Sequence, residues 1–478
     1  MLFNSINFAL FLPVVFGLYW FVTNRKLAAQ NILLLVSSYF FYACWDWRFL
    51  FLLIFSTLLD YFTGIKMSDA QNGKNKRFWF WLSICVNLGF LGVFKYYNFF
   101  ADSFADALSV LGVKVDVWTL QIILPVGISF YTFHGLSYVI DIYKDRIKAE
   151  KNFIEYAVFV SFFPLLVAGP IERATHLLPQ IKVKRVFNYN NAIDGLRQIL
   201  WGLFKKVVIA DQCAEYANII FNNSADYSGS TLLLGAILFA FQIYGDFSGY
   251  SDIALGTARL FGIELLRNFS FPYFSRDIAE FWRRWHISLS SWFRDYLYIP
   301  LGGSKGSMAL KVRNMFIVFV VSGFWHGANW TFIVWGLLNA IYQLPLLVLG
   351  KNRANLEIVA AGKLFPTFRE FVAMSITFLL TVFAWIFFRS ESVSHAWNFV
   401  KGIFSRTLFS LPELRPSLIF VLLIFFVLVE WFGREQKYAL EILGFRWPRP
   451  LRLTFYILLI FGVLIFTGKE QQFIYFQF

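Results

Sequence analysis

The stretch "MFIVFVVSGFWHGANWTFIVWGLLNAIYQLPLLVLG", residues 315–350, carries no formal charge. An unbroken helix over it would be about 54 Å long at about 1.5 Å per residue. A membrane core of about 30 Å needs only about 20 residues. The stretch is therefore predicted to lie in a membrane and to bend or break at Gly323 or Gly327, beside "FWHGANW".

The composition extends this reading to the whole chain. Of the 478 residues, 58% are hydrophobic and 21% aromatic, whereas soluble domains are about 45–50% apolar. Apolar runs recur from residue 7 to residue 467, with no room for a soluble domain between them. The sequence predicts an all-α polytopic membrane protein, a single domain over 1–478. The net charge of +14 is assigned to loops facing anionic membrane lipid rather than to nucleic-acid binding.

Two apolar runs have basic residues on both flanks. Run 153–169 follows Arg146 and Lys148 and precedes Lys182 and Lys184. The positive-inside rule places both flanks on the cytoplasmic side. We expect this run to be re-entrant or interfacial, because irregular backbone is tolerated at membrane depth only where protein or water covers it. Run 315–349 has the same pattern of flanks.

The stretch "FWRRWHISLSSWFRDYLYIPLGG", residues 281–303, places a histidine among aromatic residues. On a continuous helix over 281–297, His286 shares a face with Trp282, Leu289 and Phe293. A polar stripe that includes Arg284 lies apart from that face. The alternatives are a buried histidine satisfied by one hydrogen bond and an amphipathic helix at the membrane surface.

His326, in "FWHGA", lies within the long uncharged stretch. Ionisable residues at that depth are functional candidates, and an imidazole with a pKa of about 6.5 suits a general base. The alternative is a histidine that bonds a backbone carbonyl freed by the nearby glycines. His134, His176 and His395 are weaker candidates.

A third cluster is "YGDFSGYSDIALG", residues 244–256, in which Asp246 and Asp252 interrupt an apolar region. Carboxylates beside glycines suggest a polar cavity or a loop that dips inward. Helix N-capping explains them equally well. Neither residue type nor spacing indicates a metal site, and no Ser-His-Asp signature or phosphate-binding glycine loop is present.

Taken in order, "DFSGYSDIALG", "FWRRWHISLSSWFRDYLYIPLGG" and "FWHGANWTFIVWG" resemble the membrane-bound O-acyltransferase family, in particular its bacterial alginate O-acetyltransferase-like branch. "AGPIER" at 168–173 and the closing "FIYFQF" are similar to the same branch. The resemblance implies about 11–13 transmembrane or re-entrant helices around a central funnel and tunnel. It also implies acetyl transfer from cytoplasmic acetyl-CoA across the bacterial inner membrane, with no bound cofactor. The product would be an O-acetylated exopolysaccharide or envelope glycan, made directly or through a periplasmic acetyltransferase partner.

The resemblance also implies roles for single residues. His326 matches the family's catalytic histidine and would act as the general base, and His286 matches the second motif histidine. His286 would donate a hydrogen bond to the oxyanion or protonate the thiolate. The residues expected to bind substrate are Trp285, Asp246, Asp252, Arg284, Asn329 and Trp325.

Three alternatives remain. D-alanyl transfer to a cell-wall polymer is the first, because those transferases share the Trp-His-Ile-Ser core found at 285–288. A transporter or flippase with a proton relay through histidines and aspartates is the second. The third is a scaffold of a polysaccharide machine, in which both histidines would be dispensable.

Overall fold

The computed structural model describes residues 1–478 except 114–118, 121–123, 168, 469–470, 472 and 475–478. Ala168 of "AGPIER" and the last four residues of "FIYFQF" therefore lie outside the described residues. The described part is helical and contains no strand. Seven of its helices are long and apolar enough to cross a membrane, and three shorter apolar helices accompany them. The predicted all-α membrane fold is confirmed.

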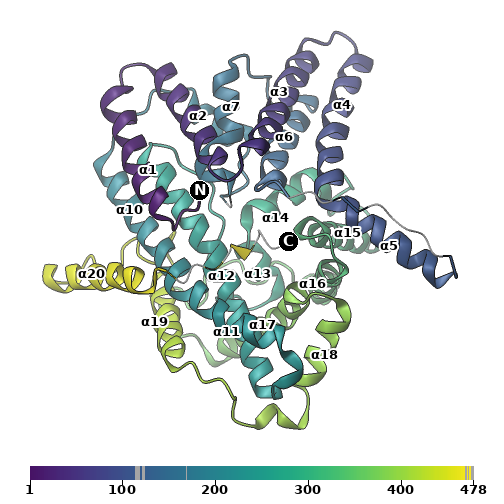
Figure 1. Ribbon diagram of the computed structural model, residues 1–478, viewed down its shortest axis with the longest axis vertical. Coiled ribbons are helices and arrows are strands. Elements are labelled where there is room, and N and C mark those ends of the chain that lie inside the picture. Colours follow the sequence, from purple (N-terminus) through teal and green to yellow (C-terminus); the bar gives the residue numbers. More distant parts are fainter. Residues whose placement is uncertain (114–118, 121–123, 168, 469–470, 472, 475–478) are drawn as a thin grey trace. The chain divides into compact units, whose positions relative to one another are not determined.

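The residues group into two compact units, of which the first comprises Met1–Ala192 and Ala258–Leu266. In this unit α3 and α4 lie side by side and both contact α6 (Figure 1). The single domain over 1–478 stays a prediction. The helices of the first unit are α1 Ile6–Gly17, α2 Leu27–Ala43, α3 Trp47–Asp69, α4 Gly73–Leu91, α5 Tyr97–Val110, α6 Ile128–Tyr143, α7 Phe153–Ser161, α8 Phe163–Leu166 and α9 Ala174–Ile181, with π-helical turns η1 Leu18–Val22 and η2 Gly92–Tyr96.

The apolar run 153–169 forms short helices rather than a span. The helix α7 has nine residues, about 13.5 Å at about 1.5 Å per residue, which is less than half of a membrane core of about 30 Å. The helix turns at Phe162, and the four-residue α8 follows. Nearly every side chain from Tyr156 to Leu166 is buried, so protein covers this interrupted backbone, as a re-entrant segment requires.

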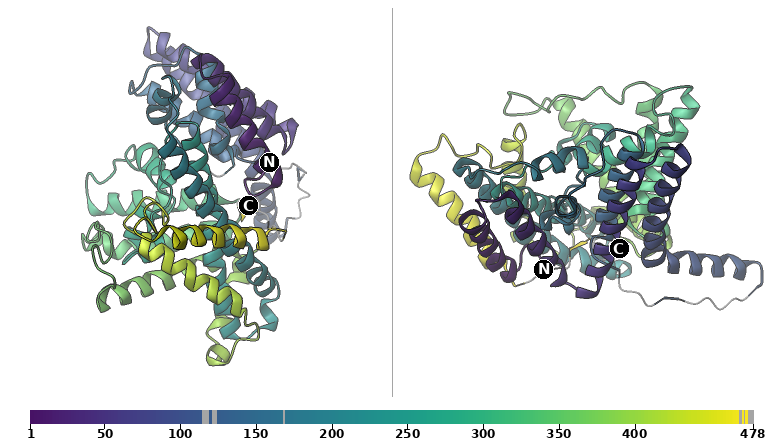
Figure 2. Two further views of the ribbon diagram at one scale, coloured as in Figure 1. Left: turned by 90° about the vertical axis from the view of Figure 1, so that its left-hand side faces the viewer. Right: turned by 90° about the horizontal axis from the view of Figure 1, so that it is seen from above.

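The second unit comprises Ile193–Thr257 and Arg267–Phe478. Four tryptophans, Trp201, Trp285, Trp335 and Trp385, are fully buried in its core. The helices α19 and α20 both pack on the π-helix η3, and they are the yellow-green and yellow helices of Figure 2. The elements that lie wholly or mostly in this unit are α10 Tyr189–Leu203, η3 Phe204–Ala210, α11 Asp211–Asn222, η4 Ser224–Asp226, α12 Gly229–Leu260, η5 Pro272–Phe274, α13 Ile278–Arg284, α14 Ile287–Phe293, η6 Arg294–Tyr298, α15 Met308–His326, α16 Trp330–Val348, α17 Phe368–Arg389, α18 Val393–Ile403, η7 Arg406–Phe409, α19 Ser417–Gly433 and α20 Arg449–Phe466.

The uncharged stretch 315–350 folds into a hairpin of two helices. The helix α15 ends at His326, Gly327 is extended, and α16 begins at Trp330. The predicted break therefore occurs at Gly327, whereas Gly323 lies inside α15. The helices α15 and α16 pack side by side (Figure 1), and Gly323 faces Phe332 and Gly336 of α16. A Cβ built on Gly323 would overlap the carbonyl oxygen of Phe332.

We expect Gly323→Ala to lower the free energy of unfolding by about 1–3 kcal/mol, because the added methyl forces two packed backbones apart. The measurement is the thermal midpoint of the purified protein in detergent. Gly89→Ala in α4 is the matched control, because a Cβ there meets no described atom within 4 Å. That change should be neutral or stabilising by roughly 0.5–1 kcal/mol. Equal midpoints for the two variants would contradict close packing at Gly323.

Candidate active site

His286 lies at a break between two short helices, so the predicted continuous helix over 281–297 is wrong. The helix α13 ends at Arg284, and α14 begins at Ile287. His286 adopts φ 44° and ψ 55°, in the left-handed region. Such a conformation costs a non-glycine residue about 1–3 kcal/mol and persists only where the surroundings impose it.

The surroundings of the break come from the segment after α12. The Ile287 amide donates to the Asn268 carbonyl at 2.9 Å, and the Ser270 amide donates to the Arg284 carbonyl at 2.9 Å. These two bonds hold residues 268–270 beside residues 284–287. The spacing of apolar residues within 281–297 depends only on that segment, so it cannot reveal the bonds to residues 268–270. For this reason it favoured a continuous helix.

The side chain of His286 is fully buried. Its Nδ1 lies 3.0 Å from Oδ1 of Asn268, and its ring is perpendicular to that of Phe247 at a centroid distance of 4.6 Å. Burial lowers the pKa of His286, which lies outside the candidate spans, to about 3. The imidazole is therefore neutral near pH 7.

His326 is the last residue of α15 and is also buried. Its ring lies 5.1 Å from the ring of Trp335 and 5.4 Å from that of Phe388, measured between centroids. The His286 and His326 rings lie 6.4 Å apart, and Trp325 contacts both. The fold thus brings together two histidines that are 40 residues apart in the sequence. Both are held among aromatic side chains that limit the access of bulk water.

The predicted substrate-binding residues Trp285 and Trp325 both lie beside the histidines. Trp285 is buried against Phe269 and Trp385, with ring centroids 5.1 Å away in each case. The α17 residues Trp385 and Phe388 thus line the site, although neither belongs to a motif that points to function. Asn329, in contrast, caps α16 through the Thr331 amide.

Asp246 and Asp252 pair with two buried lysines. Lys206 Nζ lies 2.7 Å from Asp246 Oδ1 and 2.8 Å from Asp211 Oδ1. Lys205 Nζ lies 2.5 Å from Asp252 Oδ2. Both lysines are on η3, and π-helical turns are frequent at functional sites. These two lysines were not predicted as site residues, although charges inside the apolar run 193–211 require counter-charges.

The helix α12 runs without interruption from Gly229 to Leu260. The inward loop and the N-cap are therefore both wrong, whereas the polar cavity beside the two aspartates stays a prediction. The glycines instead permit close helix packing, since a Cβ on Gly249 would lie 2.8 Å from the Gly202 carbonyl oxygen of α10. This approach brings η3 and its lysines to the aspartates. Substrate binding by Asp246 and Asp252 stays a prediction.

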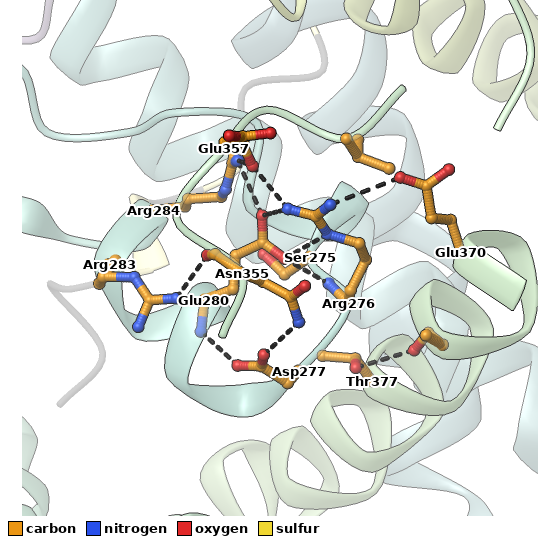
Figure 3. A network of polar contacts seen from close by, with 12 residues as sticks. Ser275, Arg276, Asp277, Glu280, Arg283, Arg284, Asn355, Glu357, Glu370 and Thr377 are labelled. Carbon is orange, nitrogen blue, oxygen red and sulfur yellow. Dashed lines mark hydrogen bonds and ion pairs between the residues drawn. The ribbon is translucent and has the colours of Figure 1, made fainter. Parts of the chain in front are cut away.

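Arg284 belongs to a network of polar contacts around α13 (Figure 3). Its guanidinium donates to Glu280 Oε1 at 2.8 Å, and Arg276 also pairs with that buried carboxylate at 3.1 Å. Arg283 donates to the backbone carbonyls of Asn352 and Asn355, which tie the loop after α16 to α13. The arginines thus fix the helix that leads into His286. Binding of substrate by Arg284 stays a prediction.

The other histidines have different surroundings. His134, in the first unit, accepts a hydrogen bond from the Glu172 amide at 3.1 Å. His176 Nδ1 lies 2.8 Å from Glu172 Oε2, and this carboxylate raises the pKa of His176. His395, in the first turn of α18, lies 3.2 Å from Ser224 Oγ. No group of three or more potential metal ligands occurs among the described residues.

Comparison with known proteins identifies the chain's relatives. Residues 144–383 match the model of the membrane-bound O-acyltransferase family. The "Probable alginate O-acetylase AlgI" of Pseudomonas aeruginosa is 39% identical over 445 residues, 92% of this chain and 82% of that protein. The "Peptidoglycan O-acetyltransferase" of Helicobacter pylori is 38% identical over 432 residues, 84% of this chain and 80% of that protein.

A more distant group also matches. The "Teichoic acid D-alanyltransferase" of Streptococcus thermophilus is 31% identical over 261 residues, 51% of this chain and 62% of that protein. The acetyl-transferring relatives thus match at higher identity and over most of the chain. The resemblance seen in the motifs is confirmed, and the chain belongs to the membrane-bound O-acyltransferase family, as a multi-pass membrane O-acyltransferase.

Proposed function

We propose that the protein transfers an acetyl group from cytoplasmic acetyl-CoA across the bacterial inner membrane to hydroxyl groups of an exopolysaccharide or another envelope glycan. Transfer is either direct or through a periplasmic acetyltransferase partner. The observation that carries the proposal is the pair of buried histidines, His286 and His326, with ring centroids 6.4 Å apart. The names of the relatives, which mention alginate and peptidoglycan, support an acetyl donor and a glycan acceptor.

Acetyl transfer from a thioester to a hydroxyl requires a general base and a group that stabilises the oxyanion, and two imidazoles can fill these two roles. One ring takes the proton of the acceptor hydroxyl as its oxygen attacks the thioester carbonyl, a step worth about 10²- to 10⁴-fold in rate. The other ring stabilises the oxyanion that forms on that carbonyl. The aromatic walls formed by Trp325, Trp335 and Phe388 limit competing hydrolysis of the thioester.

The proposal is tested by comparing two acyl donors in sealed vesicles that contain the purified protein. Acetyl-CoA labelled in its acetyl group is supplied on one side, together with an alginate or peptidoglycan fragment on the other. We expect labelled acetate esters on the glycan only when the protein is present, formed without further protein if transfer is direct and only after periplasmic proteins are added if a partner completes it. A matched reaction with a D-alanyl thioester donor should give no ester. Transfer of D-alanine in place of acetate would contradict the proposal and favour the cell-wall polymer alternative.

A further inference from the structure

Asn268 joins three elements of the second unit at a single buried amide. Its Nδ2 donates to Ser251 Oγ of α12 at 3.0 Å. Its Oδ1 accepts from Ser288 Oγ of α14 at 2.9 Å and lies 3.0 Å from Nδ1 of His286. The side chain is 1% exposed. Such a buried amide at the junction leaves the His286 ring with few orientations.

The orientation of the Asn268 amide follows from its neighbours, because amide oxygen and nitrogen are assigned from hydrogen bonds. The backbone N–H of Ser288 points at Oδ1 from 3.4 Å. A backbone N–H can only donate, so the group that faces it must be the carbonyl oxygen. Flipping the amide would place its NH₂ group against that N–H. The atom that faces His286 is therefore an acceptor.

This orientation decides which nitrogen of His286 carries the proton. A neutral imidazole has one N–H and one bare nitrogen. Because Asn268 Oδ1 can only accept, Nδ1 of His286 must carry the hydrogen. The lone pair therefore resides on Nε2, which is buried and has no hydrogen-bond partner among the residues that the structure describes. A neutral His286 in this tautomer cannot donate a hydrogen bond to an oxyanion.

We propose that Asn268 is a positioning residue that fixes the tautomer of His286, so that Nε2 of His286 is the atom that takes the proton of the acceptor hydroxyl. This inference rests on the proposed function. It reverses the roles that the motifs suggest, because His326 is then the ring that stabilises the oxyanion. Both histidines remain essential under either assignment.

In this mechanism His286 alone accepts the hydroxyl proton and later gives it to the leaving group. The hydroxyl O–H bond breaks, its proton moves to Nε2, and the oxygen forms a bond to the thioester carbonyl carbon. The carbonyl oxygen becomes an oxyanion beside His326. When the tetrahedral species collapses, the C–S bond breaks and the Nε2 proton passes to the leaving sulfur. The products are the acetate ester and the free thiol, and His286 returns to its starting tautomer.

The first test measures the tautomer directly, without any acetyl transfer. Nitrogen NMR of the protein labelled with ¹⁵N-histidine distinguishes a bare ring nitrogen from a protonated one. The chain has five histidines, and the His286 signals are assigned by their loss in His286→Gln. We expect a protonated Nδ1 and a bare Nε2 in the unmodified protein and in Asn268→Asp, which keeps an acceptor oxygen. Asn268→Leu should give a mixture of tautomers.

A buried asparagine elsewhere controls for general loss of stability. Asn314 is also fully buried, and its side chain bonds the carbonyls of Leu301 and Gly303. It lies 12 residues before His326 on α15, about 18 Å away at about 1.5 Å per residue. Asn314→Leu should leave the His286 signals unchanged. A protonated Nε2 in the unmodified protein would overturn the inference even if acetyl transfer is observed.

The second test separates the two histidine roles by activity. A glutamine retains an N–H donor but has no basic nitrogen, so His326→Gln should be at least about tenfold faster than His326→Ala if His326 stabilises the oxyanion. His286→Gln should be as slow as His286→Ala. The opposite pattern, rescue at position 286 and none at position 326, would overturn the inference. Asn268→Asp should recover most of the activity that Asn268→Leu loses, and equal losses would contradict the positioning role.

Discussion

His326→Ala should reduce acetyl transfer by at least about 10²-fold. Removing a general base lowers a rate by about 10²- to 10⁴-fold, and removing one oxyanion donor lowers it by about 10²- to 10³-fold. The expected loss therefore holds for either role of the ring. The measurement is the initial rate of labelled acetate transfer from acetyl-CoA to glycan in vesicles that contain equal amounts of each variant.

The truncation also removes a ring that packs against Trp335 and Phe388, so the variant must first show normal membrane abundance and a single peak in size-exclusion chromatography. His395→Ala is the matched control, because His395 is half-buried on α18 and bonds Ser224. It should keep most of its activity. A well-folded His326→Ala protein with more than about a tenth of the unmodified rate would exclude both roles.

The break in the stretch 315–350 and the place of His326 in the candidate site could both be predicted, because the stretch has no charged residue. A stretch of that length without a charged residue must be broken to fit a membrane, and the break was found at Gly327, one of the two positions expected. His326 stood out for the same reason, since it is the one histidine in a stretch without Asp, Glu, Lys or Arg. Hydropathy and charge are local properties, and they predict local consequences well.

The features that the sequence concealed depend on partners far away along the chain. Periodicity favoured a continuous helix through His286, yet two backbone bonds to residues 268–270 break it. Asn268 is an ordinary asparagine until the fold places it against the imidazole. Likewise, Asp246 looked like a cap or a cavity residue because its partner Lys206 is 40 positions earlier. Long-range pairing of this kind overrides local preference.

The Lys206–Asp246 pair gives the largest expected change in stability. Removing one member of a buried ion pair costs about 3–5 kcal/mol, because the remaining charge is left uncompensated. Lys206 and Asp246 are both nearly inaccessible to solvent, and Lys206 also holds Asp211. Lys206→Met should therefore lower the free energy of unfolding by about 3–5 kcal/mol. The measurement is unfolding by denaturant in detergent, with the exposed Lys305→Met as a control that should change it by less than about 0.5 kcal/mol.

A double variant separates this structural role from substrate binding by Asp246. Adding Asp246→Asn to Lys206→Met removes one of the two stranded carboxylates, so the double variant should be more stable than Lys206→Met alone, with a coupling of about 0.5–3 kcal/mol. Asp246→Asn alone should be milder, because Lys206 retains Asp211. If Asp246 instead contacts substrate, Asp246→Asn would raise KM while stability stayed unchanged, and the double variant would show no recovery. A structural ion pair predicts the reverse. Lys206→Met then lowers the stability, and the added Asp246→Asn restores part of it, because a buried carboxylate is costly only while it is charged and alone.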